Sequence, residues 1–123
     1  MPDRTVTLTT LDHGEITLPE PSWCAGHEDV PQYRTDVAHE GREQPLYLPT
    51  PDGPAVLLTV ALEQRPYTAT ALGTSPFVNV GFSGDWHPTG PAGLDAMASA
   101  LVDQAAVLRA FARQLSAALG GER

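Results

Sequence analysis

The sequence predicts an α+β fold, an antiparallel β-meander of about five or six strands packed against one long C-terminal helix. Through residues 1–83, apolar residues alternate with polar ones or form short β-branched runs between prolines and glycines, as strands do. From residue 91 on, apolar residues recur every three or four positions, as on one face of a helix. At 123 residues the chain is expected to form a single domain, residues 1–123.

The strand-rich part is expected to begin with a hairpin. Residues 5–10 (TVTLTT) alternate threonine with apolar residues, residues 12–14 supply a turn, and residues 15–18 (EITL) return as the second arm. The run AVLLTVAL at 55–62 is almost entirely apolar, which predicts a central strand buried on both faces. Other strands are expected at 33–39, 45–49 and 77–82, with an irregular segment at 65–76.

The C-terminal segment 89–119 is expected to be helical from about Pro91 to Leu119. Thr89 is the expected cap, Pro91 suits the first turn, and Gly120 ends the helix. Residues 82–87 are expected to set the direction in which the helix begins. Its apolar residues are spaced by four and three in turn: Leu94, Ala98, Leu101, Ala105, Leu108, Ala112, Leu115 and Leu119.

Such a helix would be roughly 42 Å long, slightly more than the diameter of a compact domain of this size, about 35–40 Å. One expectation is therefore that the helix meets a protein partner or forms a homodimer, since alanine permits close approach of a second helix. The alternative is that the whole apolar stripe covers the sheet.

Composition excludes some classes of function. The chain is acidic, with fifteen acidic residues, seven arginines, no lysine and a net charge of −8, which argues against nucleic-acid binding. No apolar run approaches the ~20 residues of a membrane span, and the first ten residues lack the pattern of a signal peptide. The one cysteine excludes an intramolecular disulfide. A cytoplasmic location without membrane contact is expected.

The stretch EPSWCAGHEDVPQYRTDVAH (residues 20–39) is a candidate metal site. Cys24 and His27 have the spacing of one half of a zinc site, and Gly26 between them allows the loop to turn. His39 is the candidate third ligand. The fourth ligand is left open among Glu20, Asp36, His13 and a water molecule.

The motifs PSWCAGH and DVAHEG, followed by the helix LDAMASALVDQAAVLRAFARQL, resemble a family of small actinobacterial proteins, a domain of unknown function. The resemblance covers essentially the whole chain. Some members of that family have a second cysteine four residues before the one in the W-C pair, which implies a Cys2His2 site. Here Glu20 stands at that position, which implies either a Cys-His-His-Glu site or one that has lost its metal. The resemblance implies no known activity.

Two enzyme interpretations compete with a structural metal at this site. Cys24 could act as a nucleophile with His27 or His39 as base, but the neighbouring acids would raise the pKa of its thiol. A zinc ion with an open position could activate water, with Glu20 or Glu28 as general base. The residues favour a non-enzymatic interaction or regulatory accessory protein with a small structural zinc site. The alternatives are a small metal-dependent, hydrolase-like enzyme and a metal-free binding domain.

Overall fold

The computed structural model describes residues 4–121, with the backbone alone at residues 71 and 72. It confirms the α+β class: within this range, seven strands form two antiparallel sheets and a long C-terminal helix follows them. The chain divides between Thr89 and Gly90 into two compact units, and each is described by itself. The expected domain limits, residues 1 and 123, lie outside the described residues, and the single domain stays a prediction.

The smaller sheet is the predicted N-terminal hairpin. Strands β1 (Thr5–Thr9) and β2 (Glu15–Pro19) pair antiparallel with Val6 opposite Leu18. The Thr10 hydroxyl stabilises the turn, because it donates to the carbonyl of Gly14 and accepts a hydrogen bond from the backbone of His13. Leu18 is buried, so the alternation in the sequence correctly indicates the inward face.

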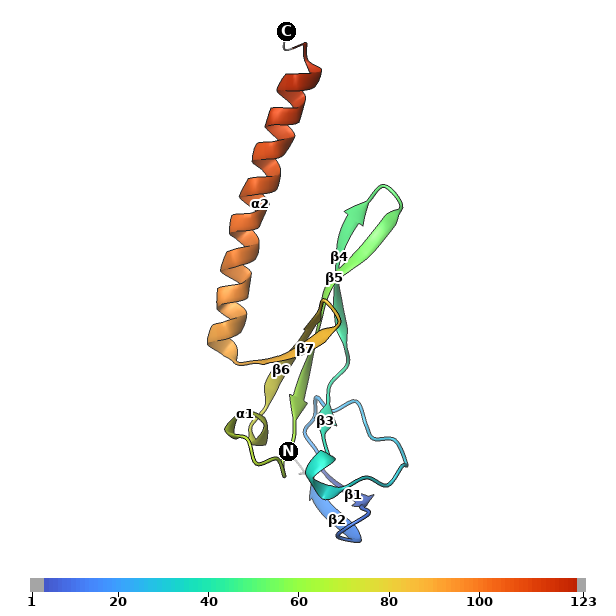
Figure 1. The fold of residues 1–123 in the computed structure, drawn as a ribbon. Helices are drawn as coiled ribbons and strands as arrows, with labels where there is room; N and C mark the ends of the chain where they lie inside the picture. The colour runs from blue at the N-terminus through green and yellow to red at the C-terminus, as the bar shows by residue number, and fades with distance from the viewer. Residues whose placement is uncertain (1–3, 122–123) are drawn as a thin grey trace. The chain divides into compact units, whose positions relative to one another are not determined.

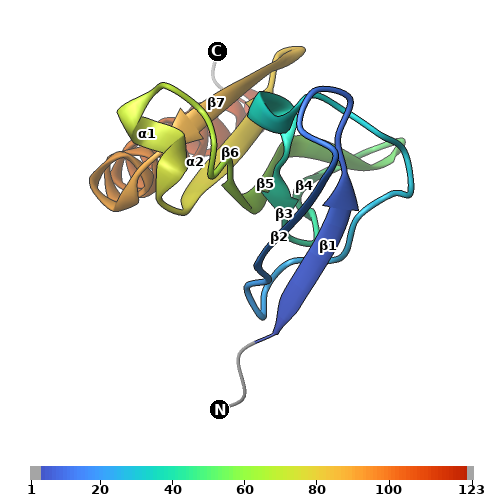
Figure 2. The same ribbon diagram turned by 90° about the horizontal axis from the view of Figure 1, so that it is seen from below.

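The larger sheet is built around β5 (Gly53–Gln64), the longest strand. One edge of β5 pairs with β4 (Gln44–Thr50) and with the short β3 (His39–Glu40). Its other edge pairs with β6 (Phe77–Phe82), and β6 pairs with β7 (Asp85–Thr89). Every pairing is antiparallel, and Figures 1 and 2 show the β1–β2 hairpin beyond the β3 end of this sheet.

The prediction that residues 55–62 are buried on both faces is wrong. Val56 is 56% exposed and Leu57 is 37% exposed. Only residues 59–63 of β5 have a partner in β6, whereas residues 53–58 lie beside β4 alone and form a two-stranded ribbon with it. The burial of β5 depends on where the neighbouring strand β6 ends, and the hydrophobicity of β5 itself carries no information about that.

The expected strand at 33–39 is also wrong in large part. Its first half is a single 3₁₀ turn at Arg34–Asp36, and only His39–Glu40 join the sheet. The side chain of Asp12 holds this turn, because its Oδ1 accepts a hydrogen bond from the backbone N–H of Arg34 at 2.9 Å. Because Asp12 is 22 residues away from Arg34 in the sequence, residues 33–39 alone do not indicate this turn.

Two short elements appear where none was expected. A four-residue helix, α1 (Ala71–Thr74), lies within the segment 65–76. Strand β7 follows a two-residue turn at Ser83 and Gly84, so residues 82–87 complete a hairpin before the helix begins. In this hairpin Trp86 lies opposite Gly81.

Replacing Gly81 with alanine is expected to destabilise the sheet by about 1–3 kcal/mol, the usual effect of overpacking. A Cβ atom there would lie 2.8–3.0 Å from three ring atoms of Trp86, so the indole would have to move. Urea unfolding of Gly81→Ala measures this effect. Repeating it in a Trp86→Ala background provides the control, because without the ring the alanine should cost nothing. An equal cost in both backgrounds would contradict the explanation.

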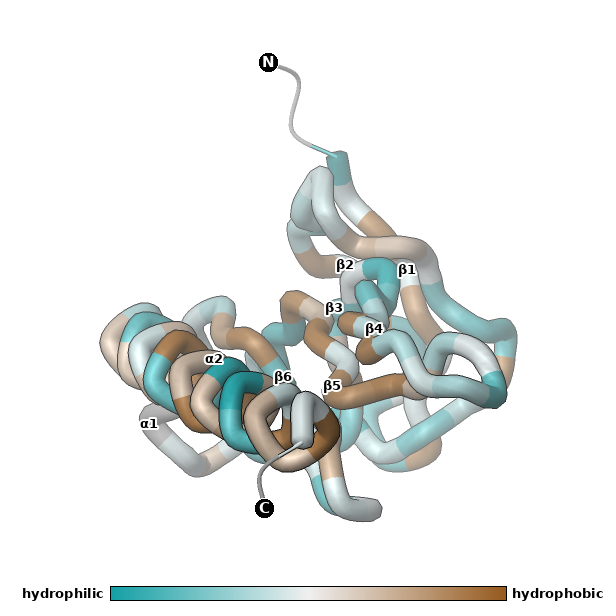
Figure 3. Tube along the Cα trace, turned by 90° about the horizontal axis from the view of Figure 1, so that it is seen from above, coloured by the Kyte–Doolittle hydropathy of each residue, from teal (hydrophilic) through white to brown (hydrophobic). Residues whose placement is uncertain are grey.

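Helix α2 spans Pro91–Leu119, as predicted, and Gly120 follows it with its N–H bonded to the carbonyl of Ser116. The expected cap is wrong: Gly90 occupies that position, while Thr89 ends β7 and its hydroxyl donates to the carbonyl of His87. No residue of α2 is buried, and Figure 3 shows hydrophobic and hydrophilic residues interleaved along it. Neither helix within residues 4–121 combines the length and hydropathy needed to cross a membrane.

Candidate metal centre

Four side chains from the predicted stretch converge on one point in the first unit. One potential ligand atom from each of Glu20, Cys24, His27 and His39 lies within 4.8 Å of the other three. Of the candidates for the fourth ligand, the fold thus brings Glu20 to the group. Such a cluster of a carboxylate, a thiol and two imidazoles could bind a metal ion.

The backbone explains how these residues meet. Glu20 follows the last residue of β2, and its N–H bonds to the carbonyl of Arg4 at 2.8 Å. His39 is the first residue of β3. Between them the loop is fastened to β3, because the N–H of Ala25 bonds to the carbonyl of Glu40 at 2.8 Å and Cys24 forms a bridge to Gly41. The centre therefore joins the smaller sheet, the loop and the larger sheet.

Gly26 makes the C-x-x-H turn possible. Its φ angle is +112°, a region that residues with a Cβ atom rarely adopt. The reversal at Gly26 turns Cys24 and His27 towards each other, with 3.6 Å between Sγ and Nε2.

The short distances within the cluster are near those of a tetrahedral site. Bond lengths of about 2.0–2.1 Å to nitrogen or oxygen and about 2.3 Å to sulfur place neighbouring ligand atoms about 3.3–3.6 Å apart. Oε1 of Glu20 lies 3.0 Å from Nε2 of His27 and 2.8 Å from Nδ1 of His39. Binding zinc would require the two histidine nitrogens to move a few tenths of an ångström away from the carboxylate, and the most widely separated ligand atoms, up to 4.8 Å apart, to approach each other.

The Nδ1 atom of His39 is the most informative atom of the centre. His39 is 2% exposed, and this nitrogen is fully buried without a hydrogen bond. The neighbouring carboxylate oxygen is at 2.8 Å, but its direction does not meet the geometry of a hydrogen bond. A buried polar atom without a well-aligned hydrogen bond is destabilising, and a bound cation would give this nitrogen a partner in addition to the carboxylate.

Electrostatics favour the ligand forms of two of these groups. Burial alone would raise the pKa of Glu20, but hydrogen bonds from His27 and Cys24 and the charges of both histidines outweigh it, so the pKa is lowered. Burial lowers the pKa of His39, although the Glu20 carboxylate opposes this. At neutral pH the centre therefore offers a carboxylate and a neutral imidazole.

Cys24 behaves differently from these two groups. Burial raises the pKa of its thiol, and the carboxylate of Glu20 adds to the effect. A thiol with a raised pKa is a poor nucleophile, which weighs against covalent catalysis. A metal ion would displace the thiol proton and bind the thiolate.

Trp23 packs beside the centre, and Val37 is buried nearby in the sequence. The indole of Trp23 meets the imidazole of His39 edge-on, with ring centroids 6.4 Å apart. Val37 is completely buried two residues before His39. Packing of this kind restrains the orientation of the His39 ring.

Two residues proposed from sequence as fourth ligands lie outside the cluster. His13 is at the hairpin tip, exposed, with its Nδ1 atom 3.1 Å from Oδ2 of Asp12. Asp36 lies in the 3₁₀ turn and is exposed. The role of the four clustered residues as ligands stays a prediction.

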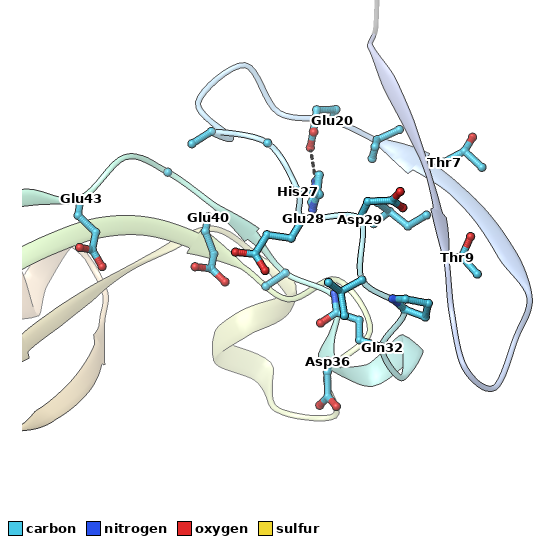
Figure 4. Close-up of a pocket in the computed structure, with 18 residues that line it drawn as sticks. Thr7, Thr9, Glu20, His27, Glu28, Asp29, Gln32, Asp36, Glu40 and Glu43 are labelled. Atoms are coloured by element: carbon cyan, nitrogen blue, oxygen red, sulfur yellow. Dashed lines mark hydrogen bonds and ion pairs between the residues drawn. The ribbon is translucent and has the colours of Figure 1, made fainter.

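A cavity of ≈ 940 Å³ opens beside the centre, and both Glu20 and His27 line it (Figure 4). Its wall is acidic and contains no arginine among the described residues. Glu20, Glu28 and Asp36 are candidate site residues from the sequence, whereas Glu40 and Glu43 were missed because they lie beyond the stretch at 20–39. The acidic lining residues are Glu20, Glu28, Asp29, Asp36, Glu40 and Glu43.

Comparisons with known proteins give one match. No curated protein and no solved structure matches the chain. A family model described as "Domain of unknown function (DUF6907)" matches residues 5–117, which include both sheets, the four clustered residues and most of α2. The protein is therefore a member of the DUF6907 family.

Proposed function

We propose that this protein is a non-enzymatic interaction or regulatory accessory protein whose first unit is held together by a structural zinc ion. Glu20, Cys24, His27 and His39 would bind the ion, and α2 would supply part of the surface for a protein partner. The observation that carries the proposal is the convergence of four ligand atoms within 4.8 Å, and it is supported by the buried Nδ1 atom of His39, which lacks a well-aligned hydrogen bond.

The kinds of ligand favour zinc over other abundant cations. Magnesium and calcium are bound by oxygen atoms, and only one of the four ligands is a carboxylate. Thiolate and imidazole in a four-membered set are typical of zinc. A single thiolate shared with two imidazoles and a carboxylate is a less common set, so the identity of the metal is part of the proposal.

A structural role follows from the number and position of the ligands. Four protein ligands fill a tetrahedral site and leave no position for substrate. The ion would fasten the end of β2 to the start of β3 and would order the loop between them, which offsets the entropy of that loop. The described part of the first unit has few other restraints, since its buried apolar residues are Leu18, Cys24, Val37, Phe77 and Val80.

The interaction role and the location rest on other features. Helix α2 exposes large apolar side chains along its length, among them Leu108 and Phe111, and such surfaces favour protein partners. A cytoplasmic location is part of the proposal, because a reducing compartment keeps the Cys24 thiol available to a metal.

A metal-dependent, hydrolase-like enzyme is the second candidate, and the acidic cavity favours it. Two of the four ligands, Glu20 and His27, line that cavity. If Glu20 left the metal, water could take its place and Glu20 or Glu28 could act as general base. In that case Glu20→Gln would retain the metal, whereas in a structural site it should weaken metal binding together with stability.

Native mass spectrometry of tag-free protein, before and after acid denaturation, tests the proposal. We expect one zinc ion per chain in the native spectrum and none after denaturation. His39→Ala should abolish the mass excess, and His13→Ala, which changes a histidine outside the cluster, should retain it. Metal-free wild-type protein, purified without chelators and supplied with zinc, would contradict the proposal.

A further inference from the structure

We infer that α2 pairs with the α2 of a second copy of this chain, antiparallel and in one particular register. The inference rests on the proposed function, in which α2 supplies the interaction surface, and it identifies the partner. Its basis is the order of side chains along this single helix.

Helix α2 carries the heptad repeat of a two-stranded coiled coil. Leucine occupies one core position every seven residues and alanine occupies the other, in three consecutive heptads. Most of these leucines are well exposed in the chain, Leu108 at 68%. The leucine positions are Leu94, Leu101, Leu108 and Leu115, and the alanine positions are Ala98, Ala105 and Ala112.

The alternation of large and small core residues selects an antiparallel pair. In parallel helices, alanine would meet alanine and leucine would meet leucine, so thin and thick layers would alternate and leave voids. In antiparallel helices each core layer between residues 94 and 112 combines one leucine with one alanine and has the same volume. The layers that form are Leu94 with Ala112, Ala98 with Leu108, and Leu101 with Ala105 of the second copy.

Charge complementarity supports the same register independently of the core. Along one edge of the core, Asp95 of each copy faces Arg109 of the other, so the dimer contains this pair twice. Within one helix the two residues are 14 positions apart, about 21 Å, and cannot pair with each other. Both are exposed, so a second copy is the partner that satisfies them symmetrically.

Apolar side chains on both edges extend the match. Val102 meets Val102 of the second copy at the centre of one edge, and Met97 meets Phe111 on the other. Residues 91–115 of the two helices overlap, which leaves the last turn of α2 beyond the contact. An overlap of about 25 residues covers more than three heptads, the length at which such patterns become significant.

The test exchanges the paired charges between two variants of the full-length, zinc-supplied protein. Asp95→Arg alone sets two arginines against each other at both ends of the dimer, and Arg109→Asp alone sets two aspartates against each other. Each variant should therefore dimerise about 10-fold more weakly than wild type, or worse. Mixing the two should give a heterodimer with two attractive pairs, resolved by mass in native mass spectrometry. The double variant should dimerise as wild type does.

Asp103→Arg and Arg113→Asp provide the matched control, because both residues lie on the outer side of the heptad. These variants should dimerise like wild type and should mix statistically. A monomeric wild type would overturn the inference, and so would variants at positions 95 and 109 that mix statistically. The same spectra report bound zinc per chain, so failure of the dimer is distinguished from failure of the metal site.

Discussion

Cys24→Ser is expected to lower the melting temperature of the zinc-supplied protein by at least about 10 °C. Serine removes the one thiolate among the proposed ligands and leaves a hydroxyl, which is a weak ligand for zinc. A ligand present at about 1,000 times its dissociation constant stabilises a fold by about 4.1 kcal/mol, and most of this would be lost. Differential scanning calorimetry with added zinc measures the shift.

The chelator provides the comparison that separates metal binding from packing. Cys24 is largely buried, so serine also introduces a buried hydroxyl, which destabilises the protein with or without a metal. A chelator should therefore lower the melting temperature of wild type strongly and that of Cys24→Ser little. His13→Ala should respond to the chelator as wild type does, since His13 lies outside the cluster.

The outcomes of the chelator experiment distinguish the three interpretations of this site: a structural metal, a catalytic metal and no metal. If the chelator removes a metal ion but leaves the melting temperature of wild type unchanged, the metal has no structural role. That result would favour the metal-dependent, hydrolase-like enzyme. If no metal is bound and the chelator has no effect, Cys24 and His39 are buried core residues, and the contact of Trp23 with His39 is simple packing.

The parts of the fold that the sequence predicts correctly are those with a local cause. The first hairpin follows from alternation in residues 5–10 and a turn at 12–14, and α2 follows from its period and from the glycine after Leu119. The parts predicted wrongly depend on distant partners. The 3₁₀ turn requires Asp12, and the exposure of Val56 depends on where β6 ends.

The same distinction applies to the candidate site. The spacing of Cys24 and His27 is local and is recognised from the sequence alone. The sequence alone leaves several candidates for the fourth ligand, because which residue reaches the cluster depends on how β2 lies beside the loop. The backbone hydrogen bond from Glu20 to Arg4 and the bridge from Cys24 to Gly41 place Glu20 at the centre, and neither has a signature in the sequence.

Leu108→Glu is expected to abolish dimerisation through α2, raising the dissociation constant roughly 1,000-fold. Each leucine buried in the core of a helix pair contributes about 2 kcal/mol, and the dimer contains two copies of Leu108, so about 4 kcal/mol is lost. Glutamate forms helices well, so α2 itself should persist. Sedimentation velocity over a range of concentrations measures the dissociation constant.

Val107→Glu is the matched control, because Val107 precedes Leu108 on the helix but lies outside the predicted core of the pair. In the single chain both side chains are exposed, Leu108 at 68% and Val107 at 48%. Neither therefore contributes much to the stability of the chain by itself, and a difference between the two variants reports on the helix pair. Pairing of α2 predicts that only the change at Leu108 shifts the protein to monomer. If both variants stay dimeric, the dimer uses another surface, and if both become monomeric, the contact does not follow the heptad.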